Sequence, residues 1–463
     1  MKKYDFIIFG NNVAAILSSL ELSKSYKVAL INPSKNWGGH FSGINLMNNN
    51  FDIGMNLLEF TTFHKQSSDL SNYNVTIRND SARFFDKVKE KVNEKNELVK
   101  VHNIKTGFND AIADDIIMLN SGDILNKLPQ KIIENIINEI NEILSKPINK
   151  LHASRKKIEE KDFLNNSLYT VSVINHGKTF HDIFIEPFVY KFYGASSKEL
   201  PALLHRSAWL PLYYPETILN FINKNNELLN NTEFEYPTSG NFSSIITNWV
   251  SDFNENITIY NSSDFTIEKN NEFNLGDNRI TGENIIWSGD LGTLSAKLRL
   301  DLKLEKSCLT LFFAIVPTSI VKSNISVLNI CDPNNPIARF TNQNICANNH
   351  NIYTKIVIEL SNELLISNNL IDDDSILVYI NNYLLDNNIL SDKLIIDHTK
   401  ILNFKDAITK PTFDNIVKYN EAQFFVMSKL DNYNFIGPST GFASSSFNDQ
   451  VVQALHISNK YKK

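Results

Sequence analysis

Hydrophobic and polar positions follow different periods in different parts of the chain. Near the start, the run YDFIIF over residues 4–9 is continuously apolar, which is typical of a strand buried on both faces of a parallel sheet. The turn GNN follows, then apolar positions at helical spacing over residues 13–24, and then KVALIN over residues 27–32 as a second buried strand. Strand, turn, helix and strand within about 30 residues predict a βαβ unit of the size found in nucleotide-binding folds.

The pattern changes twice further along the chain. Between about residues 63 and 230 apolar positions recur every three or four residues, as in IIENIINEINEILS over 132–145, so we expect a mostly helical region. Strand patterns return in ITIYNS, DFTIEKN and NIIWSG and in the stretch 309–359, and DDDSILVYINNYLLD near Asp372 predicts a capped helix. The C-terminal NFIGPST and SFNDQVVQALHISNKY predict strand, loop and helix. Strands at both ends indicate one sheet built from distant segments, with other domains inserted between.

The composition excludes several classes of protein. The chain has 463 residues, 42 % hydrophobic and 21 % charged, which is ordinary for a soluble globular protein of two or three domains. A net charge of −6 without a basic run argues against a nucleic-acid partner. Cys308, Cys331 and Cys346 lack CxxC spacing, so we expect reduced thiols and no metal site. No apolar segment precedes the first strand, and runs such as LTLFFAIV are too short to span a bilayer, so we expect a cytoplasmic protein with no transmembrane segment.

The turn GNNVAA has the spacing of the G-x-G-x-x-G/A phosphate-binding fingerprint, with one substitution. Gly10 and Ala15 fit the tight turn and the close helix–strand packing, whereas Asn12 replaces the glycine that lets the backbone approach a pyrophosphate. Asn32 ends the second strand, where an acidic residue usually binds ribose hydroxyls. An amide can hydrogen-bond either group, so we expect Asn12 to touch a pyrophosphate. The fingerprint alone fits a βαβ unit without nucleotide equally well.

Six further motifs follow in a fixed order. NPSKNWGGHF contains a GG pair, and FDIGMNLLEF from Phe51 an F-D-x-G element. FIEPFVYKFYGASSKEL from Phe184 contains K-x-Y-G, and EYPTSGNFSSIITNWV from Glu235 a Y-P-x-G-G element in which Ser239 replaces the first glycine. ITIYNSSDFTIEKN with NIIWSGDL would form return strands, and NFIGPSTGFASSSFNDQVVQAL a closing strand, loop and helix. In this order they resemble the FAD-binding amine-oxidase superfamily, which includes UDP-galactopyranose mutases, protoporphyrinogen oxidases and phytoene desaturases. The NDQVVQA portion is most similar to the mutases.

The resemblance implies an α/β fold. A FAD-binding, Rossmann-like domain of the glutathione-reductase type would carry an inserted α+β substrate domain. We expect residues 1–75, 235–300 and 420–463 to form the discontinuous FAD-binding domain. Residues 76–234 and 301–419 would form the substrate-binding domain, the first segment helical and the second rich in strands. FAD is the implied cofactor.

The resemblance also implies contacts to FAD along the whole chain. The GG pair would let the backbone pass the diphosphate closely, a segment near Phe265 would meet the adenine, and the N–H groups of 449–452 would face the flavin ring or phosphates. Pro438 stands where the family has arginine or aspartate, so with Asn12 and Asn32 it is a third departure from the pattern. The expected cofactor-binding residues are Gly10, Asn11, Asn12, Val13, Ala14, Asn32, Pro33, Trp37, Gly38, Gly39, His40, Phe265, Gly437, Pro438, Asp449, Gln450 and Val451.

On the substrate side, LLHRSAWLPLYYPE places aromatic and cationic groups together, which suits an aromatic-lined, anion-accepting pocket. The expected substrate-binding residues are His205, Arg206, Trp209, Tyr213 and Tyr214. The candidate catalytic residues are His40, Lys191, Tyr193 and Arg339, the last in IARFTNQN and similar to the family's strand arginine near the flavin. A structural role in the core or at a domain interface is the alternative for each of these side chains.

Three functions are compatible with these motifs. We predict an FAD-dependent oxidoreductase that passes a hydride from an unknown small molecule to flavin N5. A sugar-nucleotide mutase of the UDP-galactopyranose mutase type, in which reduced flavin N5 attacks an anomeric carbon, is the second, although paired arginines for a diphosphate are not evident. The third is a non-catalytic relative that has lost tight FAD binding. Hydrolase triads, HExxH and the P-loop pattern are absent from the sequence.

Overall fold

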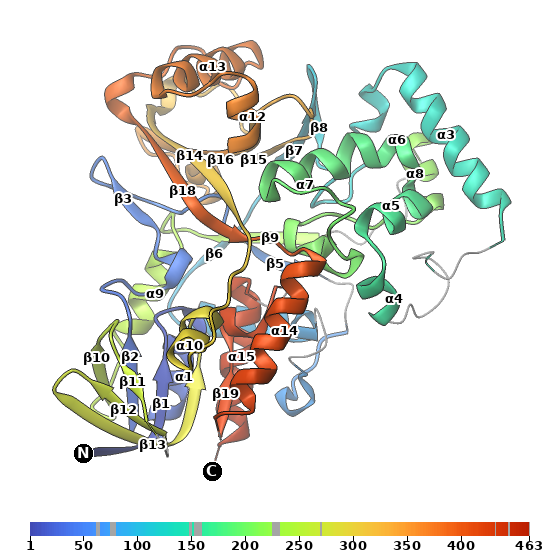
Figure 1. Ribbon diagram of the computed structural model, residues 1–463. Coiled ribbons are helices and arrows are strands. Elements are labelled where there is room, and N and C mark those ends of the chain that lie inside the picture. Colours follow the sequence, from blue (N-terminus) through green and yellow to red (C-terminus); the bar gives the residue numbers. More distant parts are fainter. Residues whose placement is uncertain are drawn as a thin grey trace.

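Two seven-stranded sheets organise the chain, and a three-stranded sheet lies at the centre of the view in Figure 1. Both chain ends lie beside the first large sheet. The computed structural model describes residues 1–61, 65–74, 80–147, 151, 160–224, 232–268, 271–430, 432–442 and 445–462.

The first sheet has the order β10-β2-β1-β13-β12-β11, with β19 paired to β13. β1, β2, β10, β13 and β19 pair in parallel, and β11 and β12 extend the sheet by antiparallel pairing. Every residue of β2 is buried, as expected for a parallel strand covered on both faces. All seven strands come from the three segments expected to form the FAD-binding domain. They are β1 (Lys2–Phe9), β2 (Val28–Asn32), β10 (Ile257–Asn261), β11 (Thr266–Ile267), β12 (Glu272–Leu275), β13 (Asn278–Trp287) and β19 (Tyr433–Phe435).

Helices cover both faces of this sheet. Phe6 and Ile8 of β1 point to the face that packs on α1 and α15, and Ile7 and Phe9 point to the face that packs on α10 and α14. This alternation along one strand explains why the four residues Phe6–Phe9 are all apolar. The helices are α1 (Val13–Ser23), α10 (Leu291–Lys297), α14 (Phe413–Met427) and α15 (Phe447–Lys460).

The second sheet has the order β18-β14-β17-β16-β15-β7-β8 and is mostly antiparallel. Two of its strands lie in the region expected to be mostly helical, because a tight turn with Asn109 at positive φ joins them into a hairpin. Its strands are β7 (Ile104–Phe108), β8 (Ala111–Asp114), β14 (Lys306–Pro317), β15 (Val327–Ile330), β16 (Ile337–Asn342), β17 (Tyr353–Ser361) and β18 (Thr399–Thr409). The helices α11 (Gln343–Cys346), α12 (Asn362–Ser367) and α13 (Asp373–Asp386) accompany it, and Asp372 caps α13 as predicted.

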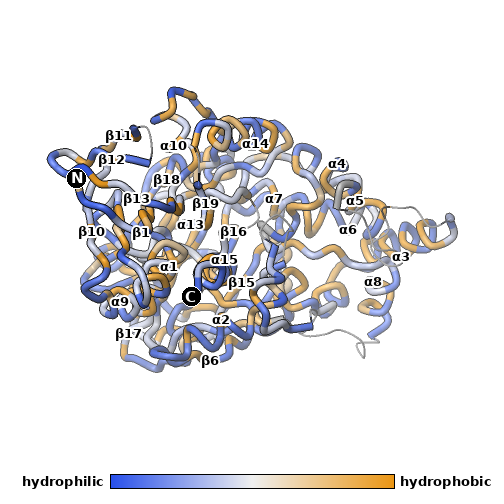
Figure 2. The backbone as a smooth tube through the Cα atoms, turned by 90° about the horizontal axis from the view of Figure 1, so that it is seen from below, coloured by the Kyte–Doolittle hydropathy of each residue, from blue (hydrophilic) through white to orange (hydrophobic). Residues whose placement is uncertain are grey.

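Eight further α-helices lie in the described part of the chain. They are α2 (Phe85–Asn93), α3 (Gln130–Ser145), α4 (Glu160–Asn165), α5 (Leu168–His176), α6 (Lys178–Phe180), α7 (Glu186–Tyr193), α8 (Pro215–Ile222) and, beside the GG turn, α9 (Ser243–Val250). α3 lies at the edge of the molecule, where hydrophobic and hydrophilic residues alternate along it (Figure 2), and it buries Ile136 and Ile140. No helix in the described part of the chain combines the length and the apolar character needed to cross a bilayer.

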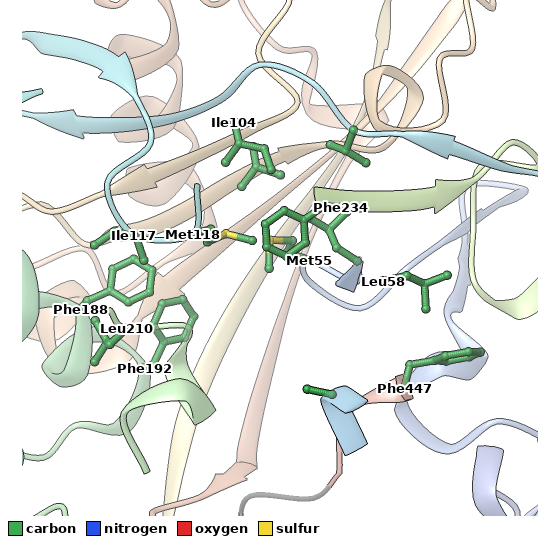
Figure 3. Close-up of a cluster of buried hydrophobic side chains, with 14 of the residues drawn as sticks. Met55, Leu58, Ile104, Ile117, Met118, Phe188, Phe192, Leu210, Phe234 and Phe447 are labelled. Atoms are coloured by element: carbon green, nitrogen blue, oxygen red, sulfur yellow. The ribbon is translucent and has the colours of Figure 1, made fainter. Parts of the chain in front are cut away.

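One hydrophobic cluster connects the part of the molecule that carries the first large sheet with the part that carries the second large sheet and the helices α3–α8. We call these parts the two halves. Phe447 of α15, Phe234 of β9 and Phe188 of α7 belong to it together with Met55 and Met118 (Figure 3). The strands β5 (Leu58–Thr61), β6 (Leu98–Lys100) and β9 (Thr232–Pro237) contribute to this cluster. The strands β3 (Ile44–Leu46) and β4 (Asn49–Phe51) pack in a separate cluster with β14 and β17. Because both halves share this core, neither half closes its hydrophobic surface alone.

The F-D-x-G element joins the two halves by polar contacts. The buried carboxylate of Asp52 accepts hydrogen bonds from the Tyr236 hydroxyl at 2.6 Å and from the Phe242 N–H at 2.9 Å. Burial raises the pKa of Asp52 to about 6, and these hydrogen bonds oppose that rise. Gly54 has φ +72°, and the next N–H, of Met55, donates to Glu359 Oε1 of the second sheet at 2.7 Å.

Gly54→Ala is expected to destabilise the protein more than Gly276→Ala. Both glycines have φ above +60°, which costs an alanine about 1–2 kcal/mol. A Cβ at Gly54 would also lie 2.4 Å from Glu359 Oε1, whereas a Cβ at Gly276 meets nothing within 4 Å. We therefore expect a further loss of about 1–3 kcal/mol in the free energy of unfolding for Gly54→Ala, measured in urea. Equal losses for the two variants would contradict this role of Gly54.

Candidate functional site

The first turn is built as the glycine fingerprint requires. Gly10 has φ +139°, and a Cβ there would lie 3.2 Å from both Ala15 Cβ and Ser288 Cβ. The turn between β1 and α1 therefore packs directly against the residue that follows β13. A side chain at position 10 or a larger one at position 15 would push these elements apart.

Asn12 points into this junction. Its Oδ1 accepts hydrogen bonds from the Ala15 N–H at 3.1 Å and from Ser288 Oγ at 2.7 Å, and its Nδ2 donates to the Ser288 carbonyl. The residue is 7 % exposed and forms the N-cap of α1. The amide is thus turned toward Ser288, which counts against the predicted direct contact between Asn12 and a pyrophosphate in this state.

Gln450 reaches the same helix end from α15. Its Oε1 accepts from the Ala14 N–H at 3.3 Å, and its Nε2 donates to the Ser445 carbonyl at 2.8 Å. A Cβ at Gly437 would lie 2.6 Å from Ser288 Oγ and 3.4 Å from Asn12 Nδ2, so the loop after β19 closes on the same point. Four distant segments therefore meet at the N-terminus of α1.

The GG pair is fastened to the first turn. The Gly38 N–H donates to the Asn11 carbonyl at 2.5 Å, and Asn11 Nδ2 donates to the Asn36 carbonyl at 2.9 Å. Trp37 packs edge-on against Phe253, with ring centroids 5.6 Å apart. The GG pair and the first turn are therefore in direct contact.

Asn32 keeps one polar group without a partner. Its Oδ1 accepts from the Ser34 N–H at 2.9 Å, but its Nδ2 is buried and has no hydrogen-bond partner within the described residues. The side chain is 1 % exposed. Leaving such a donor unpaired is unfavourable, so this end of the site lacks an acceptor. Phe265, expected near the adenine, has its side chain in the core, 4.9 Å from the Phe9 ring centroid, which leaves its backbone for any contact.

A cavity of about 590 Å³ lies next to these elements and between the two halves. His40 and Phe41 line it after the GG pair, residues 55–57 after the F-D-x-G element, and residues 447–449 at the start of α15. The facing wall comes from the segment 205–214. It contains the five residues that the sequence predicts to bind the substrate: His205, Arg206, Trp209, Tyr213 and Tyr214. Among the described residues, neither Gly10–Ala15 nor Asn32 lines this cavity.

The polar groups of the cavity are mostly paired. Arg206 forms an ion pair with Glu59 at 2.5 Å and lies over the Trp209 ring, 5.6 Å from its centroid. His205 Nδ1 donates to the Leu210 carbonyl at 2.6 Å, and the buried Tyr213 hydroxyl donates to the Ile116 carbonyl at 2.5 Å. Although the His40 ring is exposed on the cavity wall, desolvation by the surrounding protein lowers its pKa to about 4, so this imidazole is neutral.

Three of the four candidate catalytic residues lie outside the cavity lining. Lys191 is fully buried, and its Nζ donates to the Ile330 and Ile337 carbonyls at 2.8 and 3.0 Å. Arg339 forms an ion pair with Glu359 at 3.2 Å and lies 4.7 Å from the Phe192 ring centroid. Tyr193 is buried as well. These side chains pack α7 against the second sheet, and only His40 among the candidates faces the cavity.

Sequence reasoning did not single out Ser288 or Glu59. Ser288 directly follows the apolar run of β13, and polar residues at the carboxyl ends of parallel strands are the ones that meet at a shared edge. That signal could have identified Ser288. Glu59 lies within FDIGMNLLEF, but its pairing with Arg206 joins positions 147 apart in the chain, which no local pattern indicates.

No protein-family model matches the sequence, and no curated protein matches it significantly. Solved structures are similar in fold. The reduced UDP-galactopyranose mutase has a TM-score of 0.74 at 12 % identity, over 99 % of this chain and 94 % of that one. A double mutant of putrescine oxidase has 0.59 at 10 %, over 99 % of each chain, and an oxidoreductase from Methanosarcina mazei has 0.57 at 11 %, over 99 % and 100 %. The predicted fold, and the resemblance to the amine-oxidase superfamily at the level of the fold, are confirmed.

We expect Lys191 to make stability depend on pH. Burial lowers its pKa to about 7, below the ordinary value of 10.5, so above pH 7 the unfolded chain binds one more proton than the folded chain. The free energy of unfolding should therefore rise with pH, approaching about 1.4 kcal/mol per pH unit. Lys191→Met should abolish this slope, measured by urea unfolding between about pH 7 and 8.5.

The upper limit avoids the buried Cys331 thiol, because burial raises its pKa to about 12 from 9.0 and its titration in the unfolded chain would cancel the slope at higher pH. The matched control is Lys393→Met at an exposed lysine, which should keep the slope of the unaltered protein. A slope that persists in Lys191→Met would mean that another group causes it.

Proposed function

We propose that the chain is an FAD-dependent oxidoreductase that acts on a small molecule held in the cavity between its halves. The observation that carries the proposal is the convergence of motifs on that cavity. The residues after the GG pair, after F-D-x-G and at the start of α15 form one wall, and the HRSAW–PLYY segment forms the facing wall. The elements of the first wall lie in motifs that resemble the flavin family, and the two walls together come from four separate stretches of the sequence.

The residues fit FAD at both ends of the site. At one end, Asn32 Nδ2 is a buried donor that a ribose hydroxyl could pair. At the other, aromatic side chains such as Phe41, Phe447 and Trp209 give the cavity walls that suit a flat ring system. Between the ends, the N-terminus of α1 and the backbone of Gly38 and Gly39 would hold the diphosphate.

When bound, FAD supplies the hydride-accepting chemistry, which side chains do not provide. The chain's own residues would bind and orient the substrate. Tyr214 and Trp209 offer aromatic surface on the facing wall, and Arg206, neutralised by Glu59, offers hydrogen-bond donors without a net charge. The neutral His40 ring would accept a hydrogen bond from the substrate at its unprotonated imidazole nitrogen. Such a cavity favours a neutral or weakly polar substrate with an apolar or aromatic part.

A sugar-nucleotide mutase is the second candidate, favoured by the likeness in fold to UDP-galactopyranose mutase. A sugar nucleotide carries a diphosphate, which proteins bind with clustered cations. Arg206 is the one arginine or lysine among the described residues that line the cavity, and Glu59 pairs with it. Arg339 lies outside the lining. The charge of the cavity therefore supports the oxidoreductase better than the mutase.

The purified protein, equilibrated with excess FAD, should give a protein-bound flavin spectrum. Under anaerobic conditions at least one member of a panel of amines, alcohols and unsaturated ring compounds should bleach it without added reductant. Tyr214→Ala should raise the substrate concentration needed for half-bleaching about three- to tenfold, because an aromatic wall contact is lost. Tyr353→Ala, at an exposed tyrosine outside the cavity lining, should leave that concentration unchanged.

Turnover of a sugar nucleotide that requires prior reduction by dithionite would favour the mutase instead. A protein that binds no FAD at any concentration would overturn both enzymatic functions and leave the non-catalytic alternative.

A further inference from the structure

The N-terminus of α1 is already hydrogen-bonded by the chain itself. The first N–H groups of a helix have no partner within the helix, and these are the groups that bind phosphates in nucleotide folds. Here the Ala14 N–H donates to Gln450 Oε1 and the Ala15 N–H donates to Asn12 Oδ1. Two amide oxygens therefore occupy the positions where an anion's oxygens would be bonded.

Asn12 and Gln450, which we call the amide pair, are fixed from behind. Asn12 is held by two hydrogen bonds with Ser288, and Gln450 by its bond to the Ser445 carbonyl. Both side chains are buried, Asn12 to 7 % exposure and Gln450 to 0 %. Both side chains are therefore part of the protein interior. A group that binds the Ala14 and Ala15 N–H groups has to replace them.

Asn12 accounts for the missing glycine. With glycine at this position, the Ala15 N–H and the Ser288 hydroxyl would lose their shared acceptor, and the folded chain would depend on a ligand to supply one. Asparagine is among the most favourable N-cap residues, so the substitution completes the helix end without any ligand.

We propose that the amide pair is an internal substitute for the cofactor diphosphate. The inference rests on the proposed function, in which FAD is the cofactor. Without FAD, the two amides accept hydrogen bonds from the Ala14 and Ala15 N–H groups at the start of α1. FAD binds only when the side chains of Asn12 and Gln450 turn away and give up their bonds, so its binding is weak and reversible.

The opposite end of the site agrees with reversible binding. Asn32 Nδ2 has no substitute acceptor within the described residues. The N–H groups expected to bind the diphosphate are thus paired with the amide pair, whereas the Asn32 amide, expected to bind the ribose, keeps an unpaired donor. A fold that had abandoned the nucleotide would be expected to pair this group as well, since a buried unpaired donor is costly.

The test compares FAD affinity and the stability of the FAD-free chain. Asn12→Gly removes the substitute oxygen and restores the usual glycine, and Asn12→Ser keeps an N-cap oxygen but is too short to bridge to the Ser288 carbonyl. We expect both to lower the Kd for FAD, about tenfold or more for Asn12→Gly, measured by quenching of flavin fluorescence. The Tm of the FAD-free protein should fall in Asn12→Gly and fall less in Asn12→Ser.

Asn109→Gly, at the turn between β7 and β8, is the matched control and should leave the Kd unchanged. If the variants and the unaltered protein bind FAD with the same affinity, the amide pair does not compete with the cofactor and the inference fails, while the proposed function stands. If none of the proteins binds FAD, both fail.

Discussion

Asp52 joins the part of the molecule that carries the first sheet to the part that carries the second. Its carboxylate accepts hydrogen bonds from Tyr236 and Phe242, and its backbone N–H and carbonyl bond to the Gln343 side chain of α11. A buried carboxylate is costly, and the pKa of about 6 reflects that cost, so the joint depends on both donors being in place. Two residues on, Gly54 and Met55 meet Glu359, which in turn pairs with Arg339. The cavity lies where it does because this line of polar contacts sets the distance between its walls.

The charges around the cavity are largely satisfied before any ligand arrives. Arg206 on the cavity wall is neutralised by Glu59, and Arg339, outside the lining, by Glu359, so neither presents a free positive charge to a ligand. The same holds at the N-terminus of α1, where Asn12 and Gln450 provide the oxygens. The protein's own side chains thus pair with the arginines and with the first N–H groups of α1. This pairing lowers the affinity of the site for anions and favours ligands recognised by their shape.

Much of the fold could be predicted from local pattern. The continuous apolar runs of β1 and β2, the stripe along α3 and the capped α13 are each determined by residues close in sequence. That Arg206 and Trp209 lie together on one cavity wall was also predictable, because they stand close together in one short segment. The direction of the Asn12 amide was not, since it depends on Ser288, 276 positions away. Lys191 resembled a catalytic lysine, but strands β15 and β16 supply its carbonyl partners.

The closing helix has a consequence for how the chain reaches its folded state. α1 packs on α15, and the Ala14 and Gln450 that touch are 436 positions apart. During synthesis, the apolar surfaces of β1 and α1 therefore stay uncovered until α15, their packing partner, has been made. High contact order of this kind slows folding and prolongs the exposure of hydrophobic segments. Folding of this part of the molecule therefore depends on α15, a segment distant in the sequence.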